Sequence, residues 1–363
     1  MDTKILTITE DARERALIIQ AAAAILRGGG LVVFPTETVY GLGAICSHEA
    51  ALLKIFTVKG RPGDNPLIAH IWNLAQLPEL ARTISPRAQL LIEKFWPGPL
   101  TLIFPKQKEV SPLITAGLDT VAVRMPSHPV ARELLQAVDI PVAAPSANLS
   151  GKPSPSRGLH AIHDLAGKVE AVIDAGPCAA GIESTVLTLA DDAGRESRPV
   201  ILRPGSITRE TLEAVLGEKV EVSGVAPLGQ TGGAQTAEDV AQPRSPGMKY
   251  RHYAPQAPVW LIEGENRNVV AEINRLLESL APGMKAAVLG TTENIGAYHH
   301  GLVLDLGSQK EPATIAARLY DLLRLCDQLP IDRIFIEGVA PQGVGLAISN
   351  RLHKAAGGNV IYV

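Results

Sequence analysis

The sequence predicts an α/β (α+β) protein with an open sheet flanked by helices, a linker, and a small second domain around a parallel sheet. Its 363 residues exceed the usual length of one compact domain, and 46% hydrophobic residues suffice for a sizeable core. Strand-like apolar runs alternate with stretches of helical period along most of the chain. Between Ser223 and Gly247 small and polar residues replace this pattern and bury too little apolar surface to order the chain. We therefore expect domains at 1–217 and 256–363, joined by a linker over 218–255.

The first domain combines eight strand-like runs with helical stretches. Residues 11–27 repeat apolar side chains at helical spacing, and Gly28-Gly29-Gly30 ends that helix by allowing left-handed backbone. Thr208 is the expected N-cap of the last helix. The predicted helices are 11–27, 48–57, 87–95, 129–138 and 208–216. The predicted strands are 31–34, 67–71, 100–104, 120–123, 141–144, 169–173, 185–189 and 200–202.

After the linker, strands and helices alternate, which is typical of a small parallel sheet covered by helices. The predicted strands are 259–262, 286–289, 302–306 and 333–336. The predicted helices are 267–280, 314–325 and 346–355.

The composition excludes several classes of protein. No apolar run is long enough to span a membrane and the N-terminus does not resemble a signal peptide, so we expect a soluble, cytoplasmic protein. Three scattered cysteines fit neither a disulfide framework nor a zinc site of paired cysteines. With a net charge of -3 and 4% aromatic residues, any contact with nucleic acid has to be local.

Polar loops follow several predicted strands, where α/β proteins bind ligands. The segment 35–43 places hydroxyls, a carboxylate and two glycines at a strand exit, although an ordinary polar turn has the same composition. Lys59 and Arg61 precede a run of Pro and Gly, as in a loop that clamps polyphosphate or in a solvated basic loop. The loops 145–154 and 181–185 add hydroxyl and amide groups, which also form turns on their own.

Arg124 and Arg203 each close an apolar strand, and an arginine that is partly buried needs an anion. That anion is either a ligand carboxylate or an internal Asp or Glu. The glycine motif that usually binds ATP phosphates is absent, as are the dinucleotide fingerprint, the serine nucleophile elbow and the zinc helix. Phosphate binding therefore needs another scaffold.

Taken together, these segments resemble the YrdC family of threonylcarbamoyl-AMP synthases, in the long form with an appended C-terminal domain. The resemblance implies a YrdC-like twisted, open mixed sheet followed by a Rossmann-like α/β/α domain, with residues 246–255 folding back over the active site. It is carried by Pro35-Thr36-Glu37-Thr38-Val39-Tyr40-Gly41-Leu42, Lys59-Gly60-Arg61, Asp64-Asn65-Pro66-Leu67, Trp96-Pro97-Gly98-Pro99-Leu100-Thr101, Val123-Arg124-Met125-Pro126, Ala144-Pro145-Ser146-Ala147-Asn148 and Arg203-Pro204-Gly205.

The resemblance further implies a nucleotidyltransferase that converts L-threonine, bicarbonate and ATP to threonylcarbamoyl-AMP and pyrophosphate. The product would pass to a transferase complex that modifies the tRNA adenosine beside the anticodon. Mg²⁺ is expected with ATP, but no carboxylate cluster indicates its ligands. A local RNA contact, the oligomeric state and the role of the C-terminal domain stay open.

The family's site residues map onto matching positions of this sequence. Threonine would be bound by Thr38, His70, Arg124, Ala144 and Ser184. ATP would be bound by Arg61, Asn65, Thr120, Ser146, Ser154, Arg203 and Tyr250. Lys59 and Arg61 would act on the phosphates, and Asn148 would orient the intermediate.

Two other functions are alternatives. A carbamoyl-phosphate-dependent enzyme of the same fold would carry zinc-finger and acylphosphatase-like modules, for which this chain has neither paired cysteines nor length. An RNA-binding factor without catalysis would show steeply salt-dependent RNA affinity and no pyrophosphate release.

Overall fold

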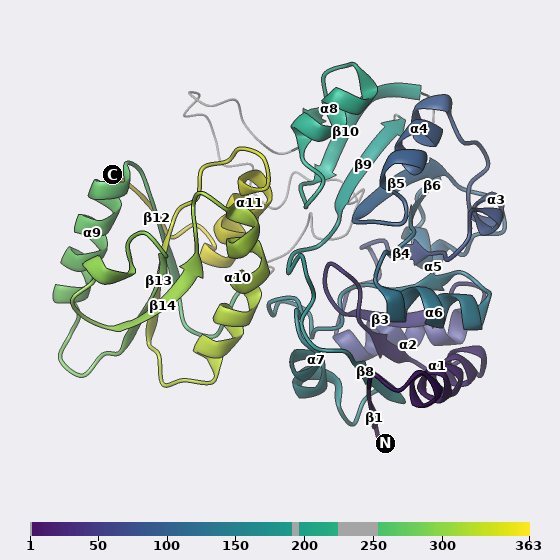
Figure 1. The fold of residues 1–363 in the computed structure, drawn as a ribbon, viewed down its shortest axis with the longest axis horizontal. Coiled ribbons are helices and arrows are strands. Elements are labelled where there is room, and N and C mark those ends of the chain that lie inside the picture. Colours follow the sequence, from purple (N-terminus) through teal and green to yellow (C-terminus); the bar gives the residue numbers. More distant parts are fainter. Residues whose placement is uncertain (1, 191–195, 224–252) are drawn as a thin grey trace.

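Two separate sheets organise the chain in the computed structural model, which describes residues 2–190, 196–223 and 253–363. An 11-stranded sheet belongs to the N-terminal part and a 5-stranded sheet to the C-terminal part. They form two bodies side by side (Figure 1). The mixed α/β class predicted from the sequence is confirmed.

The large sheet is mixed, with parallel and antiparallel neighbours. Its order is β1-β8-β2-β3-β7-β4-β6-β5-β9-β10-β11. The strands are β1 (Lys4–Thr7), β2 (Val32–Phe34), β3 (Gly41–Ile45), β4 (Ile68–His70), β5 (Leu100–Pro105), β6 (Thr120–Arg124), β7 (Val142–Ala143), β8 (Ala171–Asp174), β9 (Thr185–Ala190), β10 (Glu196–Arg203) and β11 (Glu221–Val222). The short β11 lies inside the range expected as linker, so the start of that range belongs to the large sheet.

Helices cover both faces of this sheet. They are α1 (Ala12–Arg27), α2 (Glu49–Lys59), η1 (Leu74–Gln76), α3 (Leu77–Leu80), α4 (Pro86–Phe95), α5 (Pro112–Thr115), α6 (Pro129–Val138), α7 (Gly158–Leu165) and α8 (Arg209–Leu216). Helices α1 and α6 share one apolar core with Val32 and Phe34. Helices α2, α4, α7 and α8 share another core with Val33, which points to the opposite face.

The predicted helix ends agree with the structure where their capping chemistry is strong. Asp11 caps α1 by accepting hydrogen bonds from two backbone amides, and Thr208 caps α8 through Thr211. Gly29, at φ +75°, supplies the left-handed backbone after α1.

Strand β3 was not predicted, because its two glycines look like a flexible loop in the sequence. In the structure β3 pairs antiparallel with β2, and Gly43 lies directly under the Phe34 ring. A Cβ at Gly43 would lie 2.9 Å from that ring, so close packing requires glycine here. Strands β1, β11 and β16 and helix α7 were also missed; three of these are short or at an edge.

The small sheet is entirely parallel, with the order β14-β13-β15-β12-β16. Its strands are β12 (Val259–Glu263), β13 (Ala286–Thr291), β14 (Leu302–Gly307), β15 (Arg333–Glu337) and β16 (Val360–Tyr362). Its helices are α9 (Asn266–Glu278), η2 (Ile295–Ala297), α10 (Pro312–Asp327) and α11 (Gly345–Ala356). Helix α9 packs on one face, whereas α10 and α11 pack on the other and face the first body (Figure 1). The predicted α/β/α layering is confirmed.

The core under α10 and α11 continues into the first body. Val39 and Ile182 belong to the same buried cluster as Ile315, Leu319 and Ala347. The two bodies are thus joined by shared apolar packing as well as by the chain.

All three cysteines are unpaired and buried. Within residues 2–190, 196–223 and 253–363, no helix combines the length and the apolar character needed to cross a bilayer.

Candidate active site

The site forms where loops leave neighbouring strands of the large sheet. Strands β4 and β6 are parallel, and their last residues, His70 and Arg124, are register partners. Ala144 follows β7 and donates its amide to the Ile68 carbonyl in β4. Arg203 ends β10 and is the register partner of Val186 in β9, and Ser184 directly precedes β9. Residues far apart in sequence therefore meet at one place, as the strand-end loops predicted.

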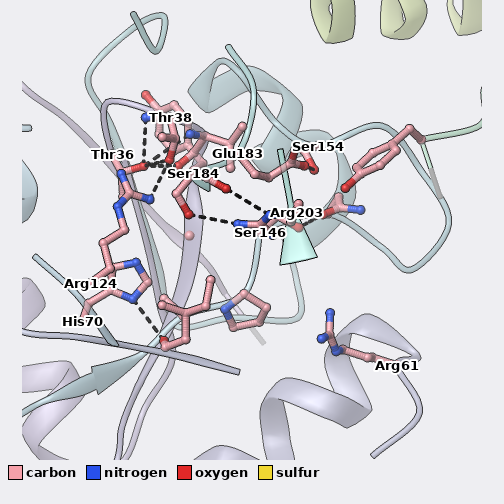
Figure 2. Close-up of a pocket in the computed structure, with 18 residues that line it drawn as sticks. Thr36, Thr38, Arg61, His70, Arg124, Ser146, Ser154, Glu183, Ser184 and Arg203 are labelled. Carbon is pink, nitrogen blue, oxygen red and sulfur yellow. Dashed lines mark hydrogen bonds between the residues drawn. The ribbon is translucent and has the colours of Figure 1, made fainter. Parts of the chain in front are cut away.

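Between these loops lies a cavity of about 630 Å³, open solvent at its mouth included. Figure 2 shows Arg124 and His70 on one side, Arg203 and Ser146 near the middle, and Arg61 on the other side. Its lining residues are Thr36, Thr38, Val39, Tyr40, Gly41, Arg61, Ile68, His70, Arg124, Ala144, Pro145, Ser146, Asn148, Ser154, Glu183, Ser184, Arg203 and Tyr253.

Arg124 is buried and already has an internal anion. Its Nη2 lies 2.6 Å from Oε1 of Glu37, and its Nη1 donates to Thr38 Oγ1 at 2.8 Å. Burial alone would raise the pKa of Glu37, but the charge of Arg124 and the hydrogen bonds it and Ser127 donate lower it. Glu37 is therefore ionised and neutralises part of the Arg124 charge. The internal ion pair, one of the two predicted alternatives, exists at the wall of the cavity.

His70 is a neutral imidazole at physiological pH. Burial, together with the nearby Arg124 charge, lowers its pKa to about 3. Its Nδ1 lies 3.1 Å from the Ile68 carbonyl, and its ring packs edge-on against Phe34. The ring is thus held in one orientation, as a hydrogen-bonding group without charge.

Arg203 and Ser184 are hydrogen-bonded to each other in the wall of the cavity. Arg203 donates from Nε to the Ser184 carbonyl at 3.1 Å and from Nη2 to Ser184 Oγ at 2.9 Å. Ser184 Oγ also lies 2.8 Å from Thr101 Oγ1. Gly205 lets the two strands approach, because a Cβ there would lie 2.3 Å from the Thr185 nitrogen.

The two cations of the predicted phosphate loop are placed differently. Arg61 lines the cavity and donates to the carbonyls of Asn65 and Pro66 at 3.2 and 3.0 Å. Lys59, the last residue of α2, is buried behind the cavity, where its Nζ donates to the carbonyls of Ser146 and Asn148. Burial, and after it the charge of Arg61, lowers the pKa of Lys59.

Ser146 and Asn148 form a tight turn over Lys59. Ser146 Oγ donates to Asn148 Oδ1 at 2.6 Å, and Asn148 Nδ2 donates to the carbonyls of Leu149 and Lys152. The amide of Asn148 is therefore committed to the loop, and Lys59 supports that loop from below.

Glu183 and Tyr253 line the cavity but were not predicted as site residues. Glu183 accepts from Ser154 Oγ at 2.6 Å, from Tyr320 at 3.0 Å and from Arg351 at 3.0 Å. Burial alone would raise the pKa of Glu183, but the charges of Arg351 and Arg203 and the Ser154 hydrogen bond hold it at about 2. Tyr253 has φ +66°, an unusual value for a bulky residue, and stacks on Tyr320 with ring centroids 5.2 Å apart.

One signal in the sequence pointed toward each of these two residues. Glu183 directly precedes Ser184, and Tyr253 lies within 246–255, the segment predicted to fold over the site. Nothing in the sequence indicated that Tyr320 and Arg351 would complete their surroundings.

Comparison with known proteins agrees with this geometry. A family model described as telomere recombination, covering Sua5, YciO and YrdC, matches residues 24–205, and one described as the threonylcarbamoyl-AMP synthase C-terminal domain matches 207–357. The chain is 46% identical to threonylcarbamoyl-AMP synthase of Bacillus subtilis over 98% of this chain and 97% of that protein. It is 45% identical to that of Pyrococcus abyssi, over 99% and 100%. The chain belongs to the threonylcarbamoyl-AMP synthase family.

A solved structure extends the likeness to the arrangement of both bodies. The crystal structure of P. abyssi Sua5 complexed with L-threonine has a TM-score of 0.88 and 42% identity, and covers 100% of both chains. The predicted recognition of the long, two-domain form is thereby confirmed.

Most residues that the family resemblance implied line the cavity described above. Those that line it are Thr38, Arg61, His70, Arg124, Ala144, Ser146, Asn148, Ser154, Ser184 and Arg203. Lys59, Asn65 and Thr120 are not among the lining residues. Thr120 begins β6, four residues before Arg124, which is roughly 13 Å along a strand. Tyr250 lies outside the described residues.

The described residues of this family member offer no resident metal site. Within 2–190, 196–223 and 253–363, no group of three or more His, Cys, Asp or Glu side chains is arranged to hold a metal ion. Both oxygens of Glu183, the carboxylate in the cavity wall, already accept hydrogen bonds. Mg²⁺ commonly reaches such sites bound to nucleotide phosphates and water.

Proposed function

We propose that this protein is a threonylcarbamoyl-AMP synthase that converts L-threonine, bicarbonate and Mg²⁺-bound ATP to threonylcarbamoyl-AMP and pyrophosphate. The observation that carries the proposal is the convergence of Arg61, Arg124 and Arg203 on one cavity that also contains a neutral histidine. An isolated amino acid and a triphosphate together present the anionic groups that such a cavity accepts. Family membership supplies the identity of the two substrates.

We assign the Arg124 side to threonine. Arg124 would pair with the threonine carboxylate while Glu37 keeps its guanidinium in place. The neutral His70 carries its proton on Nδ1, which faces the Ile68 carbonyl, so its Nε2 accepts a hydrogen bond and the ring does not attract a second anion. Thr38 and Ser184 offer hydroxyls, and Ala144 leaves space for the substrate's methyl group.

We assign the Arg61 and Arg203 side to ATP, with Asn65, Thr120, Ser146, Ser154 and Tyr250. Burial, and in addition the charge of Arg203, lowers the pKa of Arg61 to about 10, so Arg61 remains charged at neutral pH. Two buried guanidinium groups repel each other, and an anion bound between them offsets this repulsion. The carbamate of threonine attacks the α-phosphate, and fixed positive charge stabilises the pyrophosphate that leaves.

Lys59 and Asn148 are assigned to the same phosphate side. Lys59 holds the main chain of the turn that carries Ser146, and Asn148 fixes that turn from within. We further place the enzyme in the cytosol, where its product is passed to a tRNA threonylcarbamoyl transferase complex.

The test measures pyrophosphate release while each substrate is omitted in turn. We expect release to require threonine and bicarbonate together, and serine to replace threonine poorly, because it lacks the methyl group that contacts the wall near Ala144. Equal turnover without threonine would refute the proposal. RNA affinity that falls steeply with salt, with no pyrophosphate released, would indicate an RNA-binding factor instead.

A further inference from the structure

Two buried arginines of the C-terminal body reach into the loops that carry the site. Arg324 of α10 is 6% exposed and Arg351 of α11 is 1% exposed. Both donate hydrogen bonds to residues of the first body, more than 140 positions away in sequence. Buried ion pairs contribute little net stability, because desolvation of the charges offsets their attraction. The planar, multiple donors of arginine do fix the geometry of the groups they contact.

Arg324 holds the loop that ends in Ser154. Its Nε and Nη2 donate to the Pro153 carbonyl at 3.0 and 2.6 Å, and Nη2 also lies 2.8 Å from Asp164 Oδ2. Asp164 in turn accepts from the amide of Leu149 and from Lys152. One guanidinium therefore fixes this loop near both ends, next to Asn148 and next to Ser154.

Arg351 holds the two segments that carry Ser184 and Arg203. Its Nε donates to Glu183 Oε2 at 3.0 Å, and its Nη2 donates to the Pro204 carbonyl at 2.9 Å. Glu183 precedes Ser184, and Pro204 follows Arg203. Glu183 also accepts from Ser154, so it joins this group to the Arg324 loop.

The same guanidinium also holds a wall of the cavity. The Arg351 guanidinium carbon lies 5.6 Å from the centre of the Tyr253 ring. That ring stacks on Tyr320, and Tyr253 lines the cavity. Tyr320, on α10, donates to Glu183 as well. Thus α10 and α11 contact the chain neighbours of Ser154, Ser184 and Arg203 without lining the cavity themselves.

We propose that Arg324 and Arg351 are positioning residues through which the C-terminal body sets the geometry of the substrate cavity. Arg324 positions Ser154, and Arg351 positions Ser184 and Arg203. The proposal rests on the proposed function only for the assignment of these three residues to ATP and threonine. It gives the C-terminal body a direct part in substrate binding.

The experiment compares Arg324→Gln and Arg351→Gln with Arg318→Gln. Arg318 is a matched control, since it lies on α10 but pairs with Asp305 at the surface of its own body. We expect Arg324→Gln to raise the KM for ATP on the order of 10- to 100-fold, since a misplacement of about 1 Å can cost about 100-fold, and to leave the KM for threonine within about twofold. Arg351→Gln should raise both, because it positions Ser184 and Arg203. Arg318→Gln should match the unmodified protein.

Hydrogen exchange provides a readout that needs no catalysis. In Arg324→Gln we expect faster exchange across 148–156, and in Arg351→Gln across 181–187, where Thr185 donates to the Pro99 carbonyl. Circular dichroism and Tm verify folding. If a glutamine variant does not fold, Arg324→Lys and Arg351→Lys keep the charge but lose the planar donors, and the same effects are expected.

Folded variants whose KM values match those of Arg318→Gln would overturn the proposal, even if their loops exchange faster. If the unmodified protein releases no pyrophosphate, the proposed function fails instead. In that case hydrogen exchange alone tests the positioning: unchanged exchange in both loops of the arginine variants would overturn it, and faster exchange would support it. A failure of the proposed function and a failure of the positioning are therefore distinguishable.

Discussion

Replacing Arg124 with lysine keeps its charge but removes the planar fork that serves several partners at once. Arg124 lies 2.6 Å from Glu37 and donates to Thr38 at 2.8 Å and to the Gly98 carbonyl at 3.2 Å. A lysine ammonium at this position would stay with Glu37, the buried anion, and leave the threonine carboxylate without its partner. A hydrogen bond to a charged group contributes about 1.5–3 kcal/mol. At about 1.4 kcal/mol per tenfold, the KM for threonine should rise roughly 10- to 150-fold.

The assay is pyrophosphate release as a function of threonine, with ATP and bicarbonate saturating. Arg15→Lys serves as a control, because Arg15 makes a similar two-pronged pair with Glu133 between α1 and α6, away from the cavity. The reasoning is refuted if Arg124→Lys is folded and its threonine KM stays within about twofold of the control. A rise in the ATP KM alone would likewise remove Arg124 from the threonine side.

Other substitutions test the remaining parts of the site. Arg61→Ala and Lys59→Ala should raise the KM for ATP far more than the KM for threonine. Arg61 lines the cavity, and Lys59 holds the turn that carries Ser146. Pyrophosphate release measured while each substrate is titrated checks this. Gly205→Ala should cost about 1–3 kcal/mol of stability, since its Cβ would meet the Thr185 backbone at 2.3 Å; thermal unfolding should show little change in Gly296→Ala, which has open space. Glu183 has a pKa of about 2 instead of 4.5. Relative to its protonated form, ionised Glu183 stabilises the folded chain by on the order of 3 kcal/mol, and this pH-dependent part is complete above pH 4.5 and should be lost as the pH falls toward 2. Urea midpoints measured over that range should therefore fall less steeply in Glu183→Gln; an equal slope would contradict the assignment.

The sequence predicts the parts of this fold in which local chemistry and packing agree. Helix α8 begins after Thr208, its predicted N-cap, and α1 ends at Arg27, before the predicted glycine stop. Strand β3 was missed because its glycines are unfavourable in a strand on local grounds, whereas the packing of Phe34 against Gly43 requires them. Tertiary contacts decide such segments, and a single sequence does not reveal them.

The same limit applies to the site. Strand-end arginines and hydroxyl-rich loops, together with the family resemblance, group Arg61, Arg124, Ser146 and Arg203, and the structure brings these together in one cavity. The partner of a buried charge is not predictable in the same way. Lys59 binds carbonyls more than 80 positions away, and Glu183 pairs with an arginine 168 positions away. Neither pairing follows from spacing or composition.

The burial of every cysteine has a practical consequence. Burial raises the pKa of the Cys178 and Cys326 thiols to about 12, and it raises the pKa of Cys46 as well. The reactive thiolate is therefore scarce while the chain is folded. Alkylating reagents should therefore modify the protein only when it opens, and assays need no reductant. Because Cys46 and Cys178 lie in the first body and Cys326 lies on α10, the order in which they are modified reports which body opens first.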